Sequence, residues 1–421
     1  MDIKIKPQIL HGKVPAIASK ADGHRILIAS ALADGPTKIK IDTWSEDLEA
    51  TLHVLTRMGM ESRWHQDQFL TVQPIAEMPC TATLDCGNSG STLRFLFPLA
   101  AALGCNGYTY IGSRRLGERP MQPLIDVMRS HGVLIRGEKL PLVVTGQLHG
   151  GVYRLPGDVS SQYISGLLFA LPLLIADSRL ILTSAPESDA YIDMTVDTLA
   201  KFGVKIQRDG YCFTIKGRQT YVSPGEITVE KDWSNAAFWL VAGALGKEIS
   251  IDGLHRDSLQ SDRAIVSLIK KMQRKTDEDP LKAVSVSKKE LTAIDIDAAQ
   301  IPDLVPILAV LACAAQGTTV IYNAKRLRLK ESDRLKAMTD NLSVLGADIK
   351  ETADGLTIRG GKPLNGGVVQ GYDDHRIVMA CAVASLLAKG DITIIGAEAV
   401  NKSYPGFFAD FKSLGGKIDV L

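Results

Sequence analysis

Eight basic side chains recur at similar places along the chain, beside short polar segments that precede long apolar runs. They are Lys20, Arg25, Arg94, Arg119, Lys330, Arg334, Arg376 and Lys402. A single surface cation is usually solvated, but these eight, taken with the carboxylates Asp303 and Glu331, give a local charge of about +6 in a chain whose formal net charge is +1. Two small anions that carry two phosphates and two carboxylates supply roughly −5 to −6 near pH 7. The basic residues therefore predict a binding site for a pair of small anionic substrates.

The polar segments predict where these anions bind. Each contains Asp, often with Ser, Asn or Gly, and precedes an apolar run of helical length; the six segments are 21–25, 85–90, 158–162, 232–235, 302–305 and 373–376. If each opens a buried helix, its first N–H groups lack partners within the helix and its positive dipole end can bind an anion. For one segment alone, simple capping of the helix is the better explanation. The basic residues beside the segments favour anion binding.

The regular spacing of the segments indicates an internal repeat. The intervals are 63, 73, 74, 71 and 70 residues, measured along Asp22, Asp85, Asp158, Asp232, Asp303 and Asp373. Each segment is followed by a helix that is apolar on nearly all sides, a β-branched stretch and an amphipathic helix. Six repeats could form a solenoid, but a helix that is apolar on every side belongs in a closed interior. We therefore expect two domains of three repeats, with their boundary at 225–230.

Composition excludes several classes of protein. The chain has 421 residues, with 48 Lys and Arg against 47 Asp and Glu, so no overall charge attracts nucleic acid or a membrane surface. The longest nearly uninterrupted apolar run, 164–176, has 13 residues, whereas a membrane helix needs about 20. The N-terminal segment alternates rather than forming a signal peptide, so we expect a cytoplasmic protein. Six cysteines without a CxxC pair or a matching His cluster predict no metal site and no redox site.

Nine segments of the chain, in order, resemble one enzyme family. They are SKADGHR (19–25), GNSGSTLRFL (87–96), GERPMQPL (117–124), GDVSSQYISGLL (157–168), YIDMT (191–195), IPDLVP (301–306), RLRLKESDRL (326–335), DDHRIVMA (373–380) and NKSYPGFF (401–408). The chain resembles the 5-enolpyruvylshikimate-3-phosphate (EPSP) synthase family from about residue 4 to its C-terminus. The resemblance implies an α/β protein with a two-domain inside-out fold, each domain having three repeated βαβαββ units with buried parallel helices. One domain would comprise 1–18 and 231–421 and the other 19–230, with the active site in the cleft between them.

The resemblance also implies an activity. Family members transfer the enolpyruvyl group of phosphoenolpyruvate to the 5-hydroxyl of shikimate 3-phosphate and release phosphate, a step of the shikimate pathway toward chorismate and aromatic amino acids. The reaction is an addition followed by an elimination. The resemblance further implies that no metal or organic cofactor is required. We expect a monomer whose partners are these two small substrates, without nucleic acid or membrane partners.

The resemblance assigns the substrates to particular residues. Phosphoenolpyruvate would contact Lys20, Gly90, Arg119, Gln162, Arg334, Arg376 and Lys402. Shikimate 3-phosphate would contact Lys20, Arg25, Ser160, Ser161, Gln162, Ser188, Tyr191, Asp303 and Lys330. In this assignment the serines and Lys330 bind the phosphate, and Arg25 binds the carboxylate. Gly90 would leave space that phosphoenolpyruvate needs.

Proton transfer falls to Asp303, Glu331 and Lys20 by the same resemblance. Asp303 would accept the hydroxyl proton, while Glu331 and Lys20 are the candidates for the carbon and phosphate protons. The start of a buried helix suits the carboxylate form of Asp303, and the alternative is that Asp303 only caps that helix. His375 either positions Arg376 or Asp303, or exchanges protons itself.

Two departures from the family pattern leave alternatives open. Ala21 stands where the family commonly has Ser, so a hydroxyl that would contact shikimate 3-phosphate is missing. Either Asn323 or Arg326 takes a further contact to that substrate. A sister enzyme that transfers enolpyruvyl to UDP-N-acetylglucosamine has a reactive Cys where this chain has Arg114, which disfavours that activity. The other alternative is a catalytically inactive anion-binding paralogue. The sequence leaves the response to glyphosate open.

Overall fold

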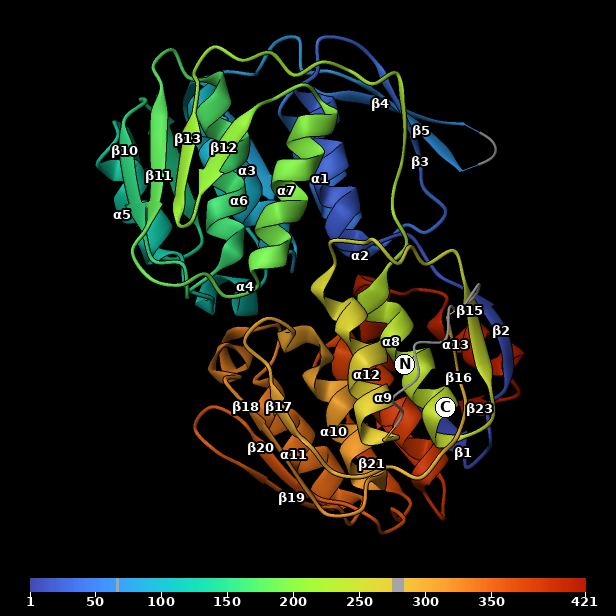
Figure 1. The fold of residues 1–421 in the computed structure, drawn as a ribbon. Helices are drawn as coiled ribbons and strands as arrows, with labels where there is room; N and C mark the ends of the chain where they lie inside the picture. The colour runs from blue at the N-terminus through green and yellow to red at the C-terminus, as the bar shows by residue number, and fades with distance from the viewer. Residues whose placement is uncertain (66–67, 275–283) are drawn as a thin grey trace. The chain divides into compact units, whose positions relative to one another are not determined.

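The structure, a computed structural model, describes residues 1–65, 68–274 and 284–421, and the chain divides into two compact units (Figure 1). Unit 1 comprises Met1–Ile17 and Lys231–Leu421, and unit 2 comprises Ala18–Glu230. Both units combine helices with small mixed sheets, which confirms the α/β class. Within the described ranges, no helix is long and apolar enough to cross a membrane.

Unit 2 contains three four-stranded sheets with the same internal arrangement, in the orders β14-β3-β5-β4, β6-β7-β9-β8 and β10-β11-β13-β12. In each sheet the first two strands are parallel and the other pairs are antiparallel. The strands are β3 (Thr37–Lys40), β4 (Glu61–His65), β5 (Phe69–Gln73), β6 (Ala82–Asp85), β7 (Cys105–Ile111), β8 (Val133–Arg136), β9 (Leu142–Gly146), β10 (Val152–Leu155), β11 (Ser178–Leu182), β12 (Ile206–Asp209), β13 (Cys212–Ile215) and β14 (Glu226–Thr228). This is the expected repeat, three times over.

The helices of unit 2 connect these strands. They are α1 (Lys20–Ala31), α2 (Glu46–Arg57), α3 (Gly90–Leu103), α4 (Arg114–Glu118), α5 (Gln122–Arg129), α6 (Ser161–Ala170), the 3-10 helix η1 (Leu171–Leu173) and α7 (Asp189–Lys201). The first repeat takes its first strand from the far end of the unit, because β14 pairs in parallel with β3. The segment 225–230, which we expected only as a boundary, therefore completes a sheet.

Unit 1 follows the same plan with strands from both ends of the chain. Its sheets have the orders β16-β15-β2, β17-β18-β20-β19 and β21-β22-β1-β23, and β1 is antiparallel to both of its neighbours. The strands are β1 (Ile3–Lys6), β2 (Gly12–Pro15), β15 (Ile249–Asp252), β16 (Val284–Val286), β17 (Asp295–Asp297), β18 (Thr318–Tyr322), β19 (Asp348–Glu351), β20 (Leu356–Arg359), β21 (Gly367–Gln370), β22 (Ile392–Ile395) and β23 (Lys417–Val420). The N-terminal segment thus supplies strands to two sheets of unit 1.

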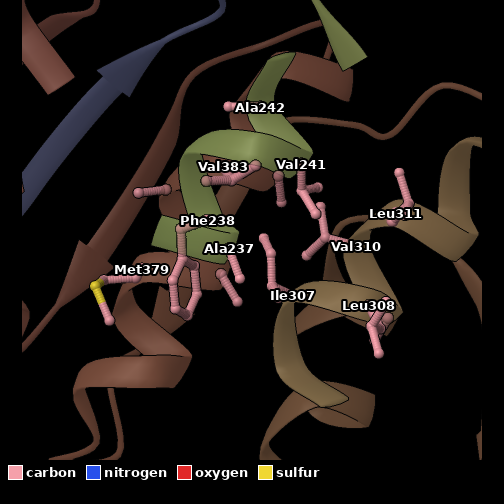
Figure 2. Close-up of a cluster of buried hydrophobic side chains, with 14 of the residues drawn as sticks. Ala237, Phe238, Val241, Ala242, Ile307, Leu308, Val310, Leu311, Met379 and Val383 are labelled. Atoms are coloured by element: carbon pink, nitrogen blue, oxygen red, sulfur yellow. The ribbon is translucent and has the colours of Figure 1, made fainter. Parts of the chain in front are cut away.

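In unit 1, helices that are buried along nearly their whole length alternate along the chain with helices that are partly exposed. They are α8 (Trp233–Leu245), η2 (Ser261–Arg263), α9 (Ala264–Met272), η3 (Pro302–Leu304), α10 (Val305–Ala314), η4 (Lys325–Leu329), α11 (Arg334–Val344), α12 (His375–Ala384), η5 (Ser385–Leu387), η6 (Ala397–Lys402) and α13 (Phe407–Ser413). Every residue of α8 and of α12 is buried, as predicted from their apolar character on all sides. Figure 2 shows side chains of α8, α10 and α12 packed together, among them Phe238, Val241, Ile307, Val310, Met379 and Val383.

Two prolines shape the buried helices of unit 2. Pro98 lies inside α3, where it cannot donate a hydrogen bond to the carbonyl of Arg94. Helix α6 approaches this carbonyl so closely that a Cβ at Gly166 would lie 2.2 Å from its oxygen, so only glycine fits there. Pro172 follows the end of α6. The helix stops at Ala170, and only a 3-10 turn continues it. The apolar run 164–176 is therefore not one continuous helix.

Candidate functional site

The carboxylate of Asp303 lies among three cations of unit 1. Arg334 donates from Nη1 to its Oδ1 at 2.7 Å, Lys330 Nζ lies 3.4 Å from the same oxygen, and Arg376 donates from Nη2 to Oδ2 at 3.3 Å. The residue belongs to η3, directly before α10, and its side chain caps neither helix. The alternative that Asp303 only caps a helix is therefore wrong.

Arg334 links three carboxylates at the start of α11 and is almost fully buried, with 1% of its side chain exposed. Besides Asp303, it donates from Nε to Asp374 Oδ2 at 2.8 Å and from Nη2 to Glu331 Oε2 at 2.9 Å. The Asp374 side chain is 0% exposed and also accepts from Ser332 Oγ at 3.0 Å. Charge-assisted hydrogen bonds of this kind are strong and directional, so the guanidinium has one fixed orientation.

These charges determine the protonation of the cluster. Burial by itself would raise the pKa of Asp303, but Arg376, Lys330 and Arg334 outweigh it and hold that pKa well below its usual range. Burial lowers the pKa of Lys330 to about 8, against the opposing attraction of Asp303. Burial would also lower the pKa of Arg334, yet Asp374, Glu331 and Asp303 raise it. Asp303 is therefore anionic, and Lys330 can exchange a proton near neutral pH.

The turn before α12 positions Arg376 and holds one further cation, Lys402. Asp374 is the N-cap of α12, and its Oδ1 accepts from the backbone N–H of Arg376 at 3.0 Å. Lys402, the last residue of η6, donates from Nζ to the carbonyl of Asp373 at 2.5 Å and lies 3.0 Å from its carboxylate. Unit 1 thus brings Asp303, Lys330, Glu331, Arg334 and Arg376 into one cluster, and Lys402 pairs with the neighbouring Asp373.

In unit 2 several of the predicted residues lie at the starts of three buried helices. Serine caps open α1, α3 and α6: Ser19 accepts from Asp22 N, Ser89 from Thr92 N and Ser160 from Gln162 N. Ser160, a predicted phosphate ligand, is therefore also an N-cap, and the buried Ser161 is the first residue of α6. The Gln162 side chain accepts from Arg94 Nη1 at 2.7 Å and donates to Ser91 at 2.9 Å, which ties α6 to α3.

Gly90, the first residue of α3, lies against the guanidinium of Arg119. A Cβ at position 90 would lie 2.6 Å from Nη1 and 2.9 Å from Cζ of this buried arginine. A side chain there would therefore displace the cation. The space that Gly90 leaves is therefore in contact with Arg119, itself a predicted ligand of phosphoenolpyruvate.

Lys20, the first residue of α1, has a carboxylate partner that sequence reasoning missed. Its Nζ donates to Asp47 Oδ2 at 2.7 Å, and both side chains are largely buried. Asp47 lies in the first turn of α2, where acidic residues are common at any helix N-terminus. No feature of its sequence context distinguishes it from a capping residue.

Arg25 is buried within unit 2 and holds the start of α7. It donates from Nε to Thr195 Oγ1 at 2.9 Å and from Nη2 to the carbonyl of Tyr191 at 2.7 Å. Its Nη1 donates to the carbonyl of Ala21 at 2.6 Å. Burial lowers the pKa of Arg25 to about 10. Ser188 precedes α7 as its N-cap and has a positive φ of 55°.

The residues whose roles the sequence left open, Asn323, Arg326 and His375, all lie in unit 1. Asn323 is exposed and donates to Asp297 at 3.1 Å, whereas Arg326 donates to the carbonyl of Ala299 at 3.1 Å. The charge of Arg326 is one of those that lower the pKa of Lys330, a predicted phosphate ligand. His375 is buried, with Nδ1 3.9 Å from Asp374 Oδ1.

The six aspartates that revealed the repeat do not have equivalent positions. Asp232 is the N-cap of α8, whereas Asp22 lies inside α1 and Asp85 ends β6. The regular spacing therefore marks the repeat and not a shared role.

Asp262 is a buried carboxylate that the sequence did not single out. It lies in η2 with 0% exposure, and its Oδ2 is hydrogen-bonded to Ser234 Oγ. Its Oδ1 is buried and has no hydrogen-bond partner among the described residues. Burial raises the pKa of Asp262 to about 6, the charge of Asp303 raises it further, and Arg376 opposes the shift.

Asp262→Asn is expected to stabilise the protein at neutral pH. The folded state holds the proton more tightly than an unfolded chain, whose Asp pKa is about 3.9, so the wild type loses stability as pH rises from about 4 to about 6. The variant lacks this loss and should gain roughly 2 to 3 kcal/mol at pH 8 but little at pH 4. Urea denaturation of both proteins at the two pH values measures the difference. An equal gain at both would show that Asp262 is not a buried, protonated acid.

Comparison with known proteins places this chain in a family. The family model described as EPSP synthase (3-phosphoshikimate 1-carboxyvinyltransferase) matches residues 5–411. Proteins named 3-phosphoshikimate 1-carboxyvinyltransferase from Clostridium kluyveri and Clostridium novyi are 45% and 42% identical to it, and each alignment covers 99% of this chain and 98% of the relative. The solved structure of EPSP synthase from Acinetobacter baumannii superposes with a TM-score of 0.82 at 26% identity, covering 100% of both chains. The chain belongs to the EPSP synthase family.

Proposed function

We propose that this chain catalyses the 3-phosphoshikimate 1-carboxyvinyltransferase reaction, in which phosphoenolpyruvate and shikimate 3-phosphate give 5-enolpyruvylshikimate 3-phosphate and phosphate. Membership of the EPSP synthase family supports the proposal. The observation that carries it is the contact of the Asp303 carboxylate with Lys330, Arg334 and Arg376. One potential base thus lies among three cations that can bind anionic substrates.

The cations of unit 1 would bind phosphoenolpyruvate with its phosphate and carboxylate. Arg334 and Arg376 have planar guanidinium groups that suit both anions, and Lys402 adds an ammonium group. Arg119, Lys20 and Gln162 would contribute from unit 2, with Gly90 leaving room for the Arg119 guanidinium. Shikimate 3-phosphate would bind mainly to unit 2, through Arg25, Ser160, Ser161, Ser188 and Tyr191.

Substrate binding would turn Asp303 into a better base. In the unliganded protein its pKa is held well below the usual range by the three cations, which makes the carboxylate a weak proton acceptor. Anionic substrates that engage Lys330, Arg334 and Arg376 would add negative charge nearby and weaken these contacts, so the pKa of Asp303 would rise. The carboxylate could then accept the 5-hydroxyl proton as the oxygen attacks C2 of phosphoenolpyruvate.

Two further proton transfers complete the reaction. The methylene carbon C3 must gain a proton during addition and lose one during elimination, when the bond between C2 and the phosphate oxygen breaks. Glu331, held at 2.9 Å by Arg334, and Lys20, held at 2.7 Å by Asp47, are the proposed groups. The cations would neutralise the charge of the leaving phosphate.

Phosphate release from phosphoenolpyruvate tests the proposed function. We expect release only when shikimate 3-phosphate is also present, with one product molecule formed for each phosphate, as followed by ³¹P NMR. Release that requires UDP-N-acetylglucosamine instead would indicate the sister activity. Arg114, which is exposed and paired with Glu118, disfavours that activity because it stands where the sister enzyme has its reactive Cys. No release with either acceptor would indicate an inactive paralogue.

We also propose that this protein is a cytoplasmic enzyme and that it acts as a monomer. Sedimentation velocity at the enzyme concentration of the phosphate assay measures the state of association. A dimer that persists at that concentration would contradict a monomeric enzyme.

A further inference from the structure

The turn that precedes α12 has an unusual backbone. Tyr372 and Asp373 have φ angles of 53° and 52°, and they are the one pair of consecutive non-glycine residues with positive φ in the described part of the chain. Residues other than glycine seldom adopt this region, and each such residue costs roughly 1 to 3 kcal/mol. The surrounding structure must therefore compensate for this turn.

Several contacts with α11 and β22 hold the turn in place. Asn341, which is buried in α11, exchanges two hydrogen bonds with the backbone of Gln370, at 2.8 and 2.9 Å. Tyr372 donates from its hydroxyl to Asp340 of the same helix at 3.1 Å. The N–H of Gly371 donates to Ile395 of β22 at 2.8 Å. The strained conformation is thus fixed from both sides.

The turn directs two oxygens of one residue at Lys402. The carbonyl oxygen of Asp373 accepts from Lys402 Nζ at 2.5 Å, and the carboxylate lies 3.0 Å from the same nitrogen. The Lys402 side chain is 5% exposed, whereas that of Asp373 is 69% exposed. An exposed carboxylate therefore neutralises a buried ammonium group.

We propose that Asp373 is an internal competitor of phosphoenolpyruvate for Lys402, and so a residue that sets the affinity for this substrate. The inference rests on the proposed function, in which Lys402 binds phosphoenolpyruvate. An anion that binds Lys402 must displace the Asp373 carboxylate or tolerate its charge. The carbonyl of Asp373 keeps the ammonium in place when the carboxylate leaves. Asp373 acts through Lys402 and has no part in the chemical step.

Asp373→Asn tests this inference with little disturbance of the backbone, because Asn tolerates positive φ as well as Asp does. Because the Asp373 carboxylate is exposed, its ion pair with Lys402 is expected to contribute up to about 1 kcal/mol. KM for phosphoenolpyruvate should therefore fall about two- to fivefold. Both kcat and the KM for shikimate 3-phosphate should change less, because the lost competition affects the binding of phosphoenolpyruvate only.

Two further variants separate competition from a general loss of negative charge. Asp419→Asn is the matched control, because Asp419 is also exposed in unit 1 and pairs with Lys6 at 3.3 Å; KM should stay unchanged. In a Lys402→Met background, which raises KM for phosphoenolpyruvate, Asp373→Asn should have no additional effect. An unchanged KM in Asp373→Asn, or an equal decrease in the Lys402→Met background, would overturn the inference.

Direct binding distinguishes this inference from the proposed function. Titration calorimetry with phosphoenolpyruvate alone, without shikimate 3-phosphate so that no reaction takes place, compares the affinities of the wild type and Asp373→Asn by the heat of binding. Tighter binding by Asp373→Asn, without phosphate release from any variant, would support the competition and contradict the proposed activity. Normal phosphate release, together with equal affinities of the wild type and Asp373→Asn, would support the proposed activity and contradict the competition.

Discussion

Asp303→Asn is expected to lower kcat by about 10²- to 10⁴-fold, the usual contribution of a general base. The amide keeps nearly the size of the carboxylate but cannot accept the 5-hydroxyl proton. It also removes the negative charge that Lys330, Arg334 and Arg376 now contact. Substrate anions should therefore bind at least as tightly, and the loss should appear in kcat rather than in KM for phosphoenolpyruvate.

The control for this prediction is Asp295→Asn. Asp295 is an exposed residue of β17 in the same repeat as Asp303, and its replacement should leave kcat unchanged. Steady-state phosphate release by the three proteins gives the comparison. If Asp303→Asn retained more than about a tenth of wild-type kcat, the 5-hydroxyl proton would have another acceptor.

Arg334→Leu is expected to destabilise the protein by about 3 to 5 kcal/mol, the cost of removing one partner from a buried ion pair. The substitution would remove the cation that pairs with the buried Asp374. It would also remove the cation that Asp303 and Glu331 both contact. The effect should be large at pH 7 and smaller at pH 4, because the carboxylates can then take up protons. Urea denaturation at the two pH values measures both effects.

Arg328→Leu is the matched control, since Arg328 also pairs with two carboxylates, Asp333 at 2.8 Å and Glu351 at 2.9 Å. Its side chain is 28% exposed, so water can solvate the remaining charges. We expect a loss of about 1 kcal/mol or less. Similar losses in both variants would mean that burial of Arg334 adds nothing to its pairing.

The repeat could be predicted from the sequence because it depends on local pattern. A helix that is apolar on all sides, such as α8 or α12, must be buried whatever its neighbours are. The stretches at 37–41, 108–112 and 318–322 are β-branched and alternating, and they form most of β3, β7 and β18. The exceptions, such as the early end of α6 at Pro172, follow from the missing N–H of proline.

The pairing of charges could not be predicted in this way. The cations were identified by their places in the repeat, but their partners depend on which elements lie side by side. Arg334 and Asp374 are 40 residues apart, and Lys20 and Asp47 are 27 apart. Nothing in the local sequence distinguishes Asp47, which holds a cation, from acidic residues that only cap helices. The same holds for Asp262, whose burial follows from tertiary packing alone.

The position of β1 has a consequence for synthesis of the protein. This strand is synthesised before every other described strand, yet it pairs with β22 and with β23, which ends at Val420. At a translation rate of about 5 to 20 residues per second, β1 waits roughly 20 to 80 seconds for its last neighbour. The segment Ala18–Glu230, which contains every strand of unit 2, is complete well before that. Unit 2 can therefore fold while the chain is still growing, whereas the sheet that contains β1 can close only after β23 has been synthesised.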